Sequence, residues 1–501
     1  MSGIKKLAGQ TIWYGASSIA ARFINLLLTP FLTYSLANTS DYGKMGLIYA
    51  AIPILNVIFT YGFETAYFRF STKEEYKKTI YSTSVLSIFF STIFFTLILW
   101  IYQGTFARIV SLQDFPTIIQ LSIFIIAFDA LNRIPFASLR EQERPRKFAF
   151  INIFSVLINV FFTWFFIGYC PNHLQQNPNS WIHYIYNSDT NPIVYVLLAN
   201  LIQSITTLLL LSGEISKVRF QFDVKLWKQM MVYSMPLIIV GMGGMINETF
   251  DRLMLAWWLP GSSVFKEQQV GIYNACYKLS ILITLFIQAF RFGAEPFFFK
   301  QAEGQNPQKV YARVMKFFVI IISVMFLLVS LYIPIWKNFI GPKYWSGLSV
   351  VPILLMANMF LGIYYNLSIW YKLSHKTMSG AWITLIGAAI TFAINYLFIP
   401  HYSFTACAWA TFSCYAAMMV ISYLWGQKEY RIPYAWKKLL AYMVIAVIIY
   451  FIHQGITKLW GGFAVSFLSA SLLLVLYILF ISKTEAKELA KLPVVGKYFN
   501  R

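Results

Sequence analysis

The segment GFETAYFRF, residues 62 to 70, closes one long apolar run, and GAEPFFFKQ, residues 293 to 301, closes another in the second half of the chain. Each segment places a glutamate two residues after a glycine and five residues before a basic residue: Glu64 in the first and Glu295 in the second. A charged side chain costs about 2.5 to 3.5 kcal/mol near the centre of a membrane helix. Its occurrence at two matching positions indicates that both halves of the chain share one architecture.

Other features repeat with the same spacing, which favours duplication over chance. The matched residues lie about 230 positions apart along the two halves. They are Arg22 and Arg252, Gly62 and Gly293, the motifs WFFI at 164–167 and YLFI at 396–399, and the basic pairs Arg140 with Arg144 and Lys372 with Lys376. The sequence therefore predicts two copies of one helical unit.

The composition is that of an integral membrane protein. Hydrophobic residues make up 58% of the 501 residues, aromatic residues 19% and charged residues only 12%, which lies outside the range of soluble domains. Apolar runs long enough to cross a hydrocarbon core of about 30 Å predict fourteen membrane helices. The predicted spans cover residues 11–36, 46–68, 79–103, 117–139, 148–169, 192–212, 229–258, 270–299, 317–336, 347–371, 378–399, 404–425, 439–455 and 460–482.

The chain has a net charge of +21, and the positions of its Lys and Arg residues indicate how it is oriented in the membrane. With a cytoplasmic N-terminus, 29 of the 40 Lys and Arg fall in inner loops and tails, 6 outside and 5 within spans. This asymmetry satisfies the positive-inside rule, predicts that both termini are cytoplasmic, and places the basic loops against anionic lipid. Nucleic-acid binding is therefore not expected. The four scattered cysteines are expected to be buried core residues rather than a disulfide framework.

The predicted fold class is an all-α membrane protein with two parallel six-helix repeats and two extra C-terminal helices. Because each repeat has an even number of helices, both enter the membrane from the same side and are related by an axis along the membrane normal. A transport site is then expected between the repeats, near the midplane. The predicted divisions are an N-lobe at 1–213, a cytoplasmic linker at 214–228, a C-lobe at 229–428, the extra helices at 429–482 and a cytoplasmic tail at 483–501.

Ten ionisable residues fall inside the predicted spans, and they would cost roughly 30 kcal/mol if they faced lipid. They must therefore face one another or water. Three couples are i,i+4 neighbours that can pair along one helix face, and for these a structural ion pair and a functional role stay equally open. The couples are Asp129 with Arg133, Glu248 with Arg252, and Arg291 with Glu295; the other four residues are Arg22, Lys278, Glu64 and Asp251.

Arg22 lies near the middle of its span and has no intrahelical partner. Its planar fork of donors suits a phosphate or carboxylate group brought to the midplane. Arg22 is therefore the first candidate for substrate binding, and Lys278, from the other repeat, is the second. The alternative for Arg22 is a salt bridge to another helix, for example to Glu64 or Asp129.

The five acidic residues of the spans are candidates for ion coupling or for a gate; they are Glu64, Glu295, Asp129, Glu248 and Asp251. Glu64 and Glu295 occupy equivalent depths near the cytoplasmic ends of the second and eighth spans. As a symmetric pair they can form an inner gate by bonding to donors on the facing repeat in the outward-open state. The alternative is a local anchor bonded to Arg69 or Lys300.

The seventh span contains Pro236 and then VGMGGMI at 240–246, where Gly241, Gly243 and Gly244 lower the cost of bending. A hinge is one interpretation, and close helix packing through small residues is the other. Some of the 32 Tyr and 15 Trp can stack on sugars, but the sequence does not indicate which.

The chain resembles the Wzx-like polysaccharide flippases of the multidrug, oligosaccharidyl-lipid and polysaccharide (MOP) exporter superfamily. The resemblance rests on the fourteen helices, Arg22, the opening segment GQTIWYGASSIAARFINLLLTPFLTYSLANTSDYG at 9–43 and the GFETAYFRF end of the second span. It implies a flippase that moves an oligosaccharide on an undecaprenyl pyrophosphate carrier from the inner to the outer leaflet of a bacterial inner membrane. O-antigen, other lipopolysaccharide parts and capsule are the implied products of such polysaccharide biosynthesis.

The resemblance also implies the partners and the competing functions. The expected partners are the lipid-linked oligosaccharide, membrane lipids and the polysaccharide polymerase machinery, with the protein itself a monomer. The lipid II flippases match at Arg22 and more weakly at Arg252, which makes Arg252 a further candidate for substrate binding; a multidrug or cation antiporter is the other alternative. A membrane glycosyltransferase or polymerase is disfavoured because the five histidines lie in loops or near a helix end, so no enzyme is expected.

No nucleotide-binding pattern GxxxxGK[ST] occurs in the sequence. Alternating access driven by the membrane potential, or by an H⁺ or Na⁺ gradient, is therefore the expected mechanism. Neither a metal nor an organic cofactor is expected.

Overall fold

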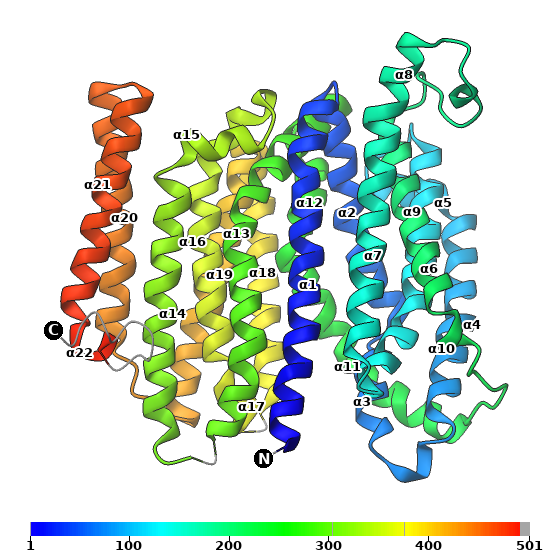
Figure 1. Cartoon of the computed structure of the whole chain (residues 1–501), viewed down its shortest axis with the longest axis horizontal. Coiled ribbons are helices and arrows are strands. Elements are labelled where there is room, and N and C mark those ends of the chain that lie inside the picture. Colours follow the sequence, from blue (N-terminus) through cyan, green and yellow to red (C-terminus); the bar gives the residue numbers. More distant parts are fainter. Residues whose placement is uncertain (1, 303, 375, 491–501) are drawn as a thin grey trace.

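The computed structural model describes residues 2–302, 304–374 and 376–490, apart from the side chains of 2–12, 295, 296, 299, 300 and 489. In this part of the chain, fourteen helices are long and apolar enough to cross a membrane, and they run side by side through the molecule (Figure 1). The predicted fold class and number of spans are confirmed. We call the side on which α1 begins the N-terminal side and the opposite side the far side.

The first six spans form the N-lobe. Its helices are α1 (Ser2–Ser35), α2 (Thr39–Thr60), α3 (Phe63–Ser71), α4 (Ile80–Ile101), α5 (Gln103–Ile109), α6 (Pro116–Glu141), α7 (Pro145–Trp164), α8 (Cys170–Gln176), α9 (Pro192–Leu210) and α10 (Ser212–Ile215). A π-helical turn, Phe165–Tyr169, joins α7 to α8, and short 3₁₀ turns lie at Glu74–Tyr76 and Trp181–Tyr184. Three of the spans begin at proline, whose fixed φ suits the first helical position and whose missing N–H is not needed there.

The next six spans form the C-lobe. Its helices are α11 (Val224–Glu248), α12 (Asp251–Trp258), α13 (Ser263–Gln301), α14 (Pro307–Ser330), α15 (Ile333–Trp336), α16 (Val351–Leu367), α17 (Ile369–Leu373), α18 (Thr377–Tyr402) and α19 (Phe404–Glu429), with 3₁₀ turns at Lys337–Phe339 and Pro342–Val350. The extra elements are α20 (Trp436–Trp460), α21 (Phe463–Thr484) and α22 (Ala486–Leu489). The four cysteines are buried and free, as expected from the sequence.

The second span ends earlier than predicted, and this explains the position of Glu64. Helix α2 stops at Thr60, and Tyr61 and Gly62 take left-handed backbone angles, with φ of 36° and 73°. Gly62 supplies this conformation without a Cβ penalty. Glu64 therefore stands in the first turn of a separate short helix, α3, rather than inside a membrane helix. The matching region of the C-lobe is different, because α13 continues without a break through Gly293.

The seventh span is also divided, into α11 and α12, with the interruption at Thr249 and Phe250. The first half of α11 packs on the N-lobe, where Leu226 and Met230 join a buried cluster with residues of α3 and α6. The second half packs on α18 of the C-lobe, where the Asn247 amide donates to the Thr384 carbonyl at 3.1 Å. Helix α11 is thus attached to both lobes. The predicted division between linker and C-lobe stays a prediction.

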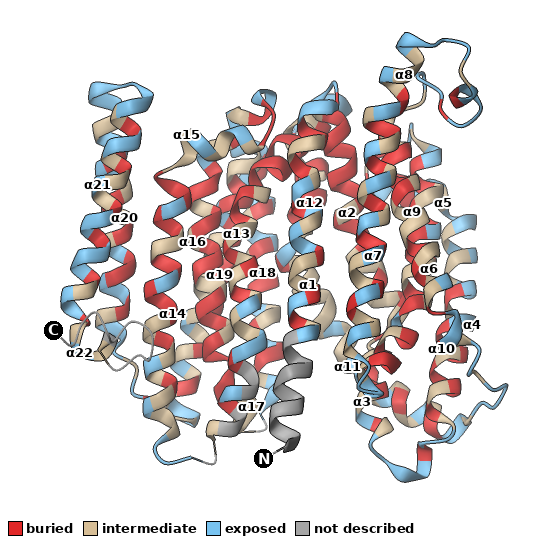
Figure 2. Cartoon of the chain, viewed as in Figure 1, coloured by how far each residue is buried: buried red, intermediate tan, exposed pale blue. Residues whose placement is uncertain are grey.

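The lobes meet on the far side through a symmetric contact between α2 and α13. A Cβ at Gly43 would overlap the Glu267 carbonyl oxygen, and a Cβ at Gly271 would overlap the Thr39 carbonyl oxygen. Each pair of equivalent residues is separated by the same 228 positions, 39 to 267 and 43 to 271. Such a reciprocal contact is the signature of a two-fold relation, and the residues around it are buried (Figure 2).

A second pair of equivalent contacts lies on the N-terminal side. Arg144 bonds Glu214 at 2.7 Å in the N-lobe, and Lys376 bonds Glu429 in the C-lobe. In each repeat the contact joins the residues just before the fifth span, α7 or α18, to the end of the sixth span, at α10 or α19. Burial raises the pKa of Glu214, but hydrogen bonds and charge from Lys217 and Lys147 outweigh it and hold that pKa below its usual value.

The extra helices α20 and α21 stand at the edge of the C-lobe, beside α14 (Figure 1). Their attachment on the N-terminal side is Glu485, which is buried and accepts bonds from Lys316 of α14 at 2.7 Å and from Lys438 of α20 at 2.5 Å. Burial alone would raise the pKa of Glu485. The hydrogen bonds from Lys316, Lys438 and Tyr442 outweigh this effect and hold the pKa below its usual value, which favours the ionised carboxylate.

Candidate functional site

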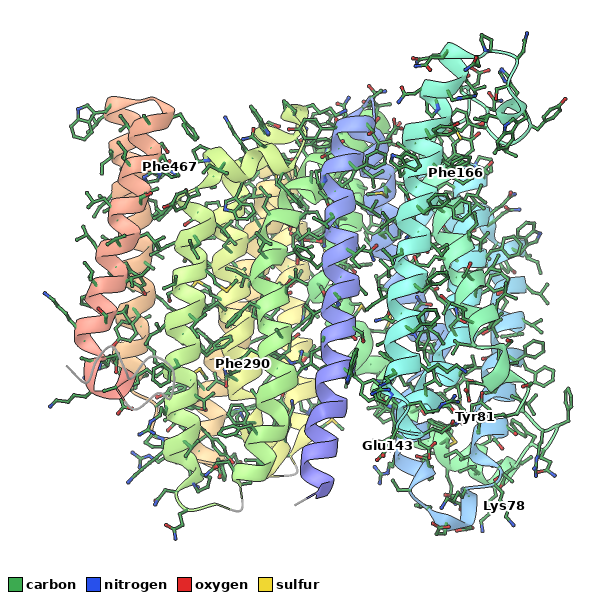
Figure 3. All side chains as sticks on the ribbon, in the orientation of Figure 1. Lys78, Tyr81, Glu143, Phe166, Phe290 and Phe467 are labelled. Atoms are coloured by element: carbon green, nitrogen blue, oxygen red, sulfur yellow. The ribbon has the colours of Figure 1, made fainter. Side chains whose placement is uncertain are left out.

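A polar cavity of about 630 Å³ lies between the lobes on the N-terminal side. Glu64 at the start of α3, Arg140 at the end of α6 and Phe148 at the start of α7 line it; Glu143, labelled in Figure 3, follows α6 three residues after Arg140. Its lining combines hydroxyls, amides, charged groups and three phenylalanines. The lining residues are Ser18, Arg22, Glu64, Asp129, Asn132, Arg133, Phe136, Arg140, Phe148, Asn152, Ser155, Gln203, Ser204, Thr207, Gln288, Arg291 and Phe292.

Arg22 projects from the middle of α1 into this cavity. It is exposed, and it forms no hydrogen bond or ion pair with any side chain that the structure describes. The alternative of a salt bridge to Glu64 or Asp129 is not formed, because those carboxylates bond to other groups. Its role in substrate binding stays a prediction.

Glu64 is held by two arginines of α6. Its carboxylate bonds Arg140 and lies 3.9 Å from Arg133, while Arg69 instead places its guanidinium 4.3 Å from the ring of Tyr233. The alternative that Glu64 is anchored by Arg69 is therefore wrong. In this conformation Glu64 bonds within its own lobe, and its role as a gate stays a prediction. The side chains of its counterpart Glu295 and of Lys300 lie outside the described residues.

Asp129 lines the cavity one turn from Arg133 but does not form the expected ion pair with it. Its Oδ1 accepts a bond of 2.7 Å from Ser204 on α9, and the carboxylate within 4 Å of Arg133 is that of Glu64. The i,i+4 pairing considered for α6 is wrong because Ser204 of α9 and Glu64 of α3 supply the partners of Asp129 and Arg133 instead.

The C-lobe contributes Gln288, Arg291 and Phe292 of α13 to the lining. The Arg291 guanidinium lies 4.0 Å from the centre of the Tyr365 ring. Glu248 is exposed at the end of α11 and is not part of the cavity lining. The predicted pair of Arg291 with Glu295 involves a side chain that is not described. The proposed ion-coupling role of Glu248 stays a prediction.

Arg252 and Asp251 form a buried ion pair away from the cavity. Their side chains are 6% and 4% exposed and bond at 2.8 Å, and Tyr273 donates to the second oxygen of Asp251 at 2.6 Å. Arg252 also donates to the backbone carbonyl of Glu248 at 2.7 Å. The predicted side-chain pair of Glu248 with Arg252 is therefore wrong. Neither Arg252 nor Asp251 lines the cavity, and the roles of Arg252 in substrate binding and of Asp251 in ion coupling stay predictions.

Lys278 is half-buried in α13, three turns before Gln288, and is not part of the cavity lining. No carboxylate that the structure describes lies within ion-pair distance of its ammonium group. Its role in substrate binding stays a prediction.

The three glycines of α11 lie in a continuous helix. A Cβ at Gly241 would come within 3.0 Å of Val57 on α2, and one at Gly243 within 3.4 Å of Leu385 on α18. Gly244 faces open space. Packing between lobes therefore accounts for Gly241, and the hinge stays a prediction.

On the far side, sequence reasoning missed a cluster of charges that joins the lobes. Lys44 of α2 lies 3.0 Å from Asp41 and 3.5 Å from Glu267 of α13, and all three side chains are less than 10% exposed. Asn191 donates to Asp41 at 2.9 Å. These residues flank the predicted spans, so they were counted as loop residues. The signal that could have revealed them is a glycine near a charge in each repeat, Gly43 next to Lys44 and Gly271 four residues after Glu267.

The model of the polysaccharide biosynthesis protein family matches residues 7–302. The chain belongs to this family. No curated protein sequence matches the chain. The resemblance of the sequence to polysaccharide exporters of the MOP superfamily is thereby confirmed.

Solved structures of the same superfamily share the fold. The lipid II flippase MurJ in an inward closed conformation superposes with a TM-score of 0.71 at 13% identity, covering 94% of this chain and 99% of its own. A multidrug resistance MATE family transporter in an inward-facing conformation gives 0.62 at 12% identity, covering 84% and 94%. This polysaccharide biosynthesis family member is thus a multi-pass membrane protein with the MOP fold.

Proposed function

We propose that this protein is a flippase for an undecaprenyl-pyrophosphate-linked oligosaccharide in surface polysaccharide assembly. It would act in a bacterial inner membrane with both termini in the cytoplasm, as a monomer that passes its product to the polymerase machinery. The observation that carries the proposal is Arg22, a cavity-facing guanidinium without a described protein partner.

The charge of the cavity favours an anionic head group. Four arginines and two carboxylates line it, and one of the carboxylates, Glu64, is already bonded to Arg140 and close to Arg133. Arg22, which has no described partner, is directed at the cavity, and guanidinium groups match phosphate oxygens in geometry. The serine, threonine, asparagine and glutamine side chains around them suit sugar hydroxyls.

A multidrug or cation antiporter is the second candidate, because a MATE family transporter shares the fold. Such a transporter needs carboxylates that are available to cations. Of the two carboxylates that line this cavity, only Asp129 has no arginine within ion-pair distance among the described residues. Because the four arginines outnumber the carboxylates, the cavity as a whole attracts anions. Asp129 is then the first candidate site for a coupling H⁺ or Na⁺.

The arrangement of the lobes supports alternating access. The far side is closed by the α2–α13 contact and the charges around Lys44, while the cavity extends to the N-terminal side. The head group would enter from that side with its prenyl tail in lipid, and rotation of the lobes would release it on the far side. A charged head group gains or loses about 2.3 kcal/mol per charge per 100 mV of membrane potential.

The test is a leaflet assay. In cells that lack the gene, the lipid-linked oligosaccharide should accumulate on the inner leaflet, and the wild-type gene should restore its transfer. Arg22→Ala should reduce the rate of transfer at least tenfold, whereas Arg108→Ala, the same substitution at an exposed arginine on the far side, should not.

Accumulation on the outer leaflet would contradict the flippase proposal, since it places the defect after transfer. An unchanged leaflet distribution combined with drug sensitivity would favour the antiporter. Full rescue by Arg22→Ala would remove the proposed phosphate contact.

A further inference from the structure

A second pocket, of about 730 Å³, opens on the far side of the N-lobe. It lies between the end of α1, the π-helical turn with α8, and the segment that leads into α9; Figure 3 labels Phe166 in the π-helical turn beside it. We call it the far-side pocket. Its volume falls in the range of about 300 to 1,000 Å³ that is typical of small-ligand sites.

The lining of the far-side pocket carries no formal charge. None of the sixteen residues around it is Asp, Glu, Lys or Arg, in contrast to the six charged residues of the central cavity. The chain has 40 Lys and Arg, but none of them lines this pocket. Because a phosphate would lack a cationic partner there, phosphate is not the preferred ligand. The ligand class must be neutral and polar.

Aromatic rings form one wall of this pocket. The Trp164 and Tyr169 rings lie 6.0 Å apart at 34°, and Tyr169 stacks on His173 at 5.3 Å. In a regular α-helix, residues five positions apart point about 140° away from each other. The π-helical turn Phe165–Tyr169 brings Trp164 and Tyr169 to one side instead, and such turns are frequent at functional sites.

Uncharged hydrogen-bonding groups also line the pocket. Asn172 uses its amide N–H₂ to bond the Gly168 carbonyl at 2.9 Å, which leaves its carbonyl oxygen to accept. The side chains of Gln176 and Thr190 form no hydrogen bond with any residue that the structure describes. A pyranose ring presents an apolar C–H face and a rim of hydroxyls, which match aromatic faces and amides, respectively.

From this lining we infer that the far-side pocket binds neutral sugar rings, namely those of the oligosaccharide after it has crossed the membrane. The identification of these sugars as the exported oligosaccharide rests on the proposed function. The match between the pocket and neutral sugars rests on its lining alone. Its position on the side opposite the central cavity makes it a site for the departing glycan. Aromatic residues that only anchor the protein at the membrane interface would need neither the pocket nor the amides that line it.

The test uses the full-length protein in lipid nanodiscs. The probe is the repeat-unit oligosaccharide without lipid or phosphate, prepared by partial acid hydrolysis of the surface polysaccharide of the producing cells. Saturation-transfer NMR should detect binding to the wild type. The double variant Trp164→Ala and Tyr169→Ala should weaken it at least tenfold, while replacement of both residues by Phe should retain most of it.

Two controls separate this site from its surroundings. Trp181→Ala removes an exposed ring of the neighbouring 3₁₀ turn that does not line the pocket and should leave the affinity unchanged. Arg108→Ala, at an exposed arginine on the same side that does not line the pocket, should also leave it unchanged. Equal affinity of the double Ala variant and the wild type, or no binding to the wild type, would overturn the inference, as would an equal loss in Trp181→Ala.

The leaflet assay distinguishes this inference from the proposed function. Loss of probe binding in the double Ala variant supports the far-side pocket even if the lipid-linked oligosaccharide does not depend on this protein for its transfer. Unchanged probe binding in that variant refutes the pocket even where Arg22→Ala abolishes transfer.

Discussion

Replacing Lys44 with methionine should open the far side of the protein. Lys44 is 8% exposed and lies between two carboxylates, Asp41 at 3.0 Å on its own helix and Glu267 at 3.5 Å on the facing lobe. Methionine keeps the length of the side chain but removes the charge, so that both carboxylates stay buried in the closed arrangement without a cation. Breaking a buried ion pair in this way costs about 3 to 5 kcal/mol.

That cost applies mainly to the closed arrangement, because separation of α2 from α13 would return Glu267 to water. At about 1.4 kcal/mol per factor of ten, even 3 kcal/mol shifts the ratio of closed to open molecules by roughly a hundredfold. Lys77→Met is the matched control: Lys77 bonds Glu74 at 3.0 Å, but the side chains are 65% and 84% exposed. An exposed pair contributes only about 0 to 1 kcal/mol.

The assay is electron–electron double resonance between spin labels on the two lobes. Asp189→Cys and Ser346→Cys are exposed positions on the far side, and the four native cysteines are buried, so labelling is selective. Lys44→Met should populate a longer distance, and the added Glu267→Gln should reverse much of that change. A distance distribution no different from that of Lys77→Met would refute the reasoning.

Three further predictions concern other sites. Arg252→Ala should lower the thermal unfolding temperature and the yield, since it leaves Asp251 buried without its cation, whereas Arg22→Ala should unfold like the wild type; unfolding followed by fluorescence checks both. Because the folded pKa of Glu214 is depressed, its stabilisation is present above the usual carboxyl pKa of about 4.3 and is lost as the pH falls through the folded value. Glu214→Gln should therefore unfold at a lower temperature at pH 7 and lose less on acidification. Gly271→Leu should prevent closure of the far side, because its side chain would overlap the carbonyl of the facing helix, and should abolish transfer in the leaflet assay.

The lengths of the apolar runs were sufficient to predict the architecture. Length and apolarity define each span independently of its neighbours, which is why the fourteen helices and the two extra C-terminal ones are confirmed. The same reasoning could not locate the left-handed break at Tyr61 and Gly62. Local backbone angles of this kind depend on how the chain packs after the helix ends.

The cost of burying charge in a membrane also selected cavity residues correctly, since Arg22, Glu64 and Asp129 all line the central cavity. The partners of these charges were predicted less well. Spacing along one helix proposes i,i+4 pairs, but Glu64 bonds Arg140, 76 positions away. Contacts between helices decide such pairs, and a single sequence does not contain the distances between helices.

Helix α11 connects two lobes whose mutual angle changes in the proposed alternating access. Met230 fixes one end of it and Asn247 the other, so the bending has to occur in the interval between them. Pro236 lies in this interval and has no backbone N–H, which leaves the hydrogen-bond ladder one rung short. We therefore expect α11 to bend near Pro236 when the two halves exchange orientation, and the rate of that exchange to depend on the stiffness of this one helix.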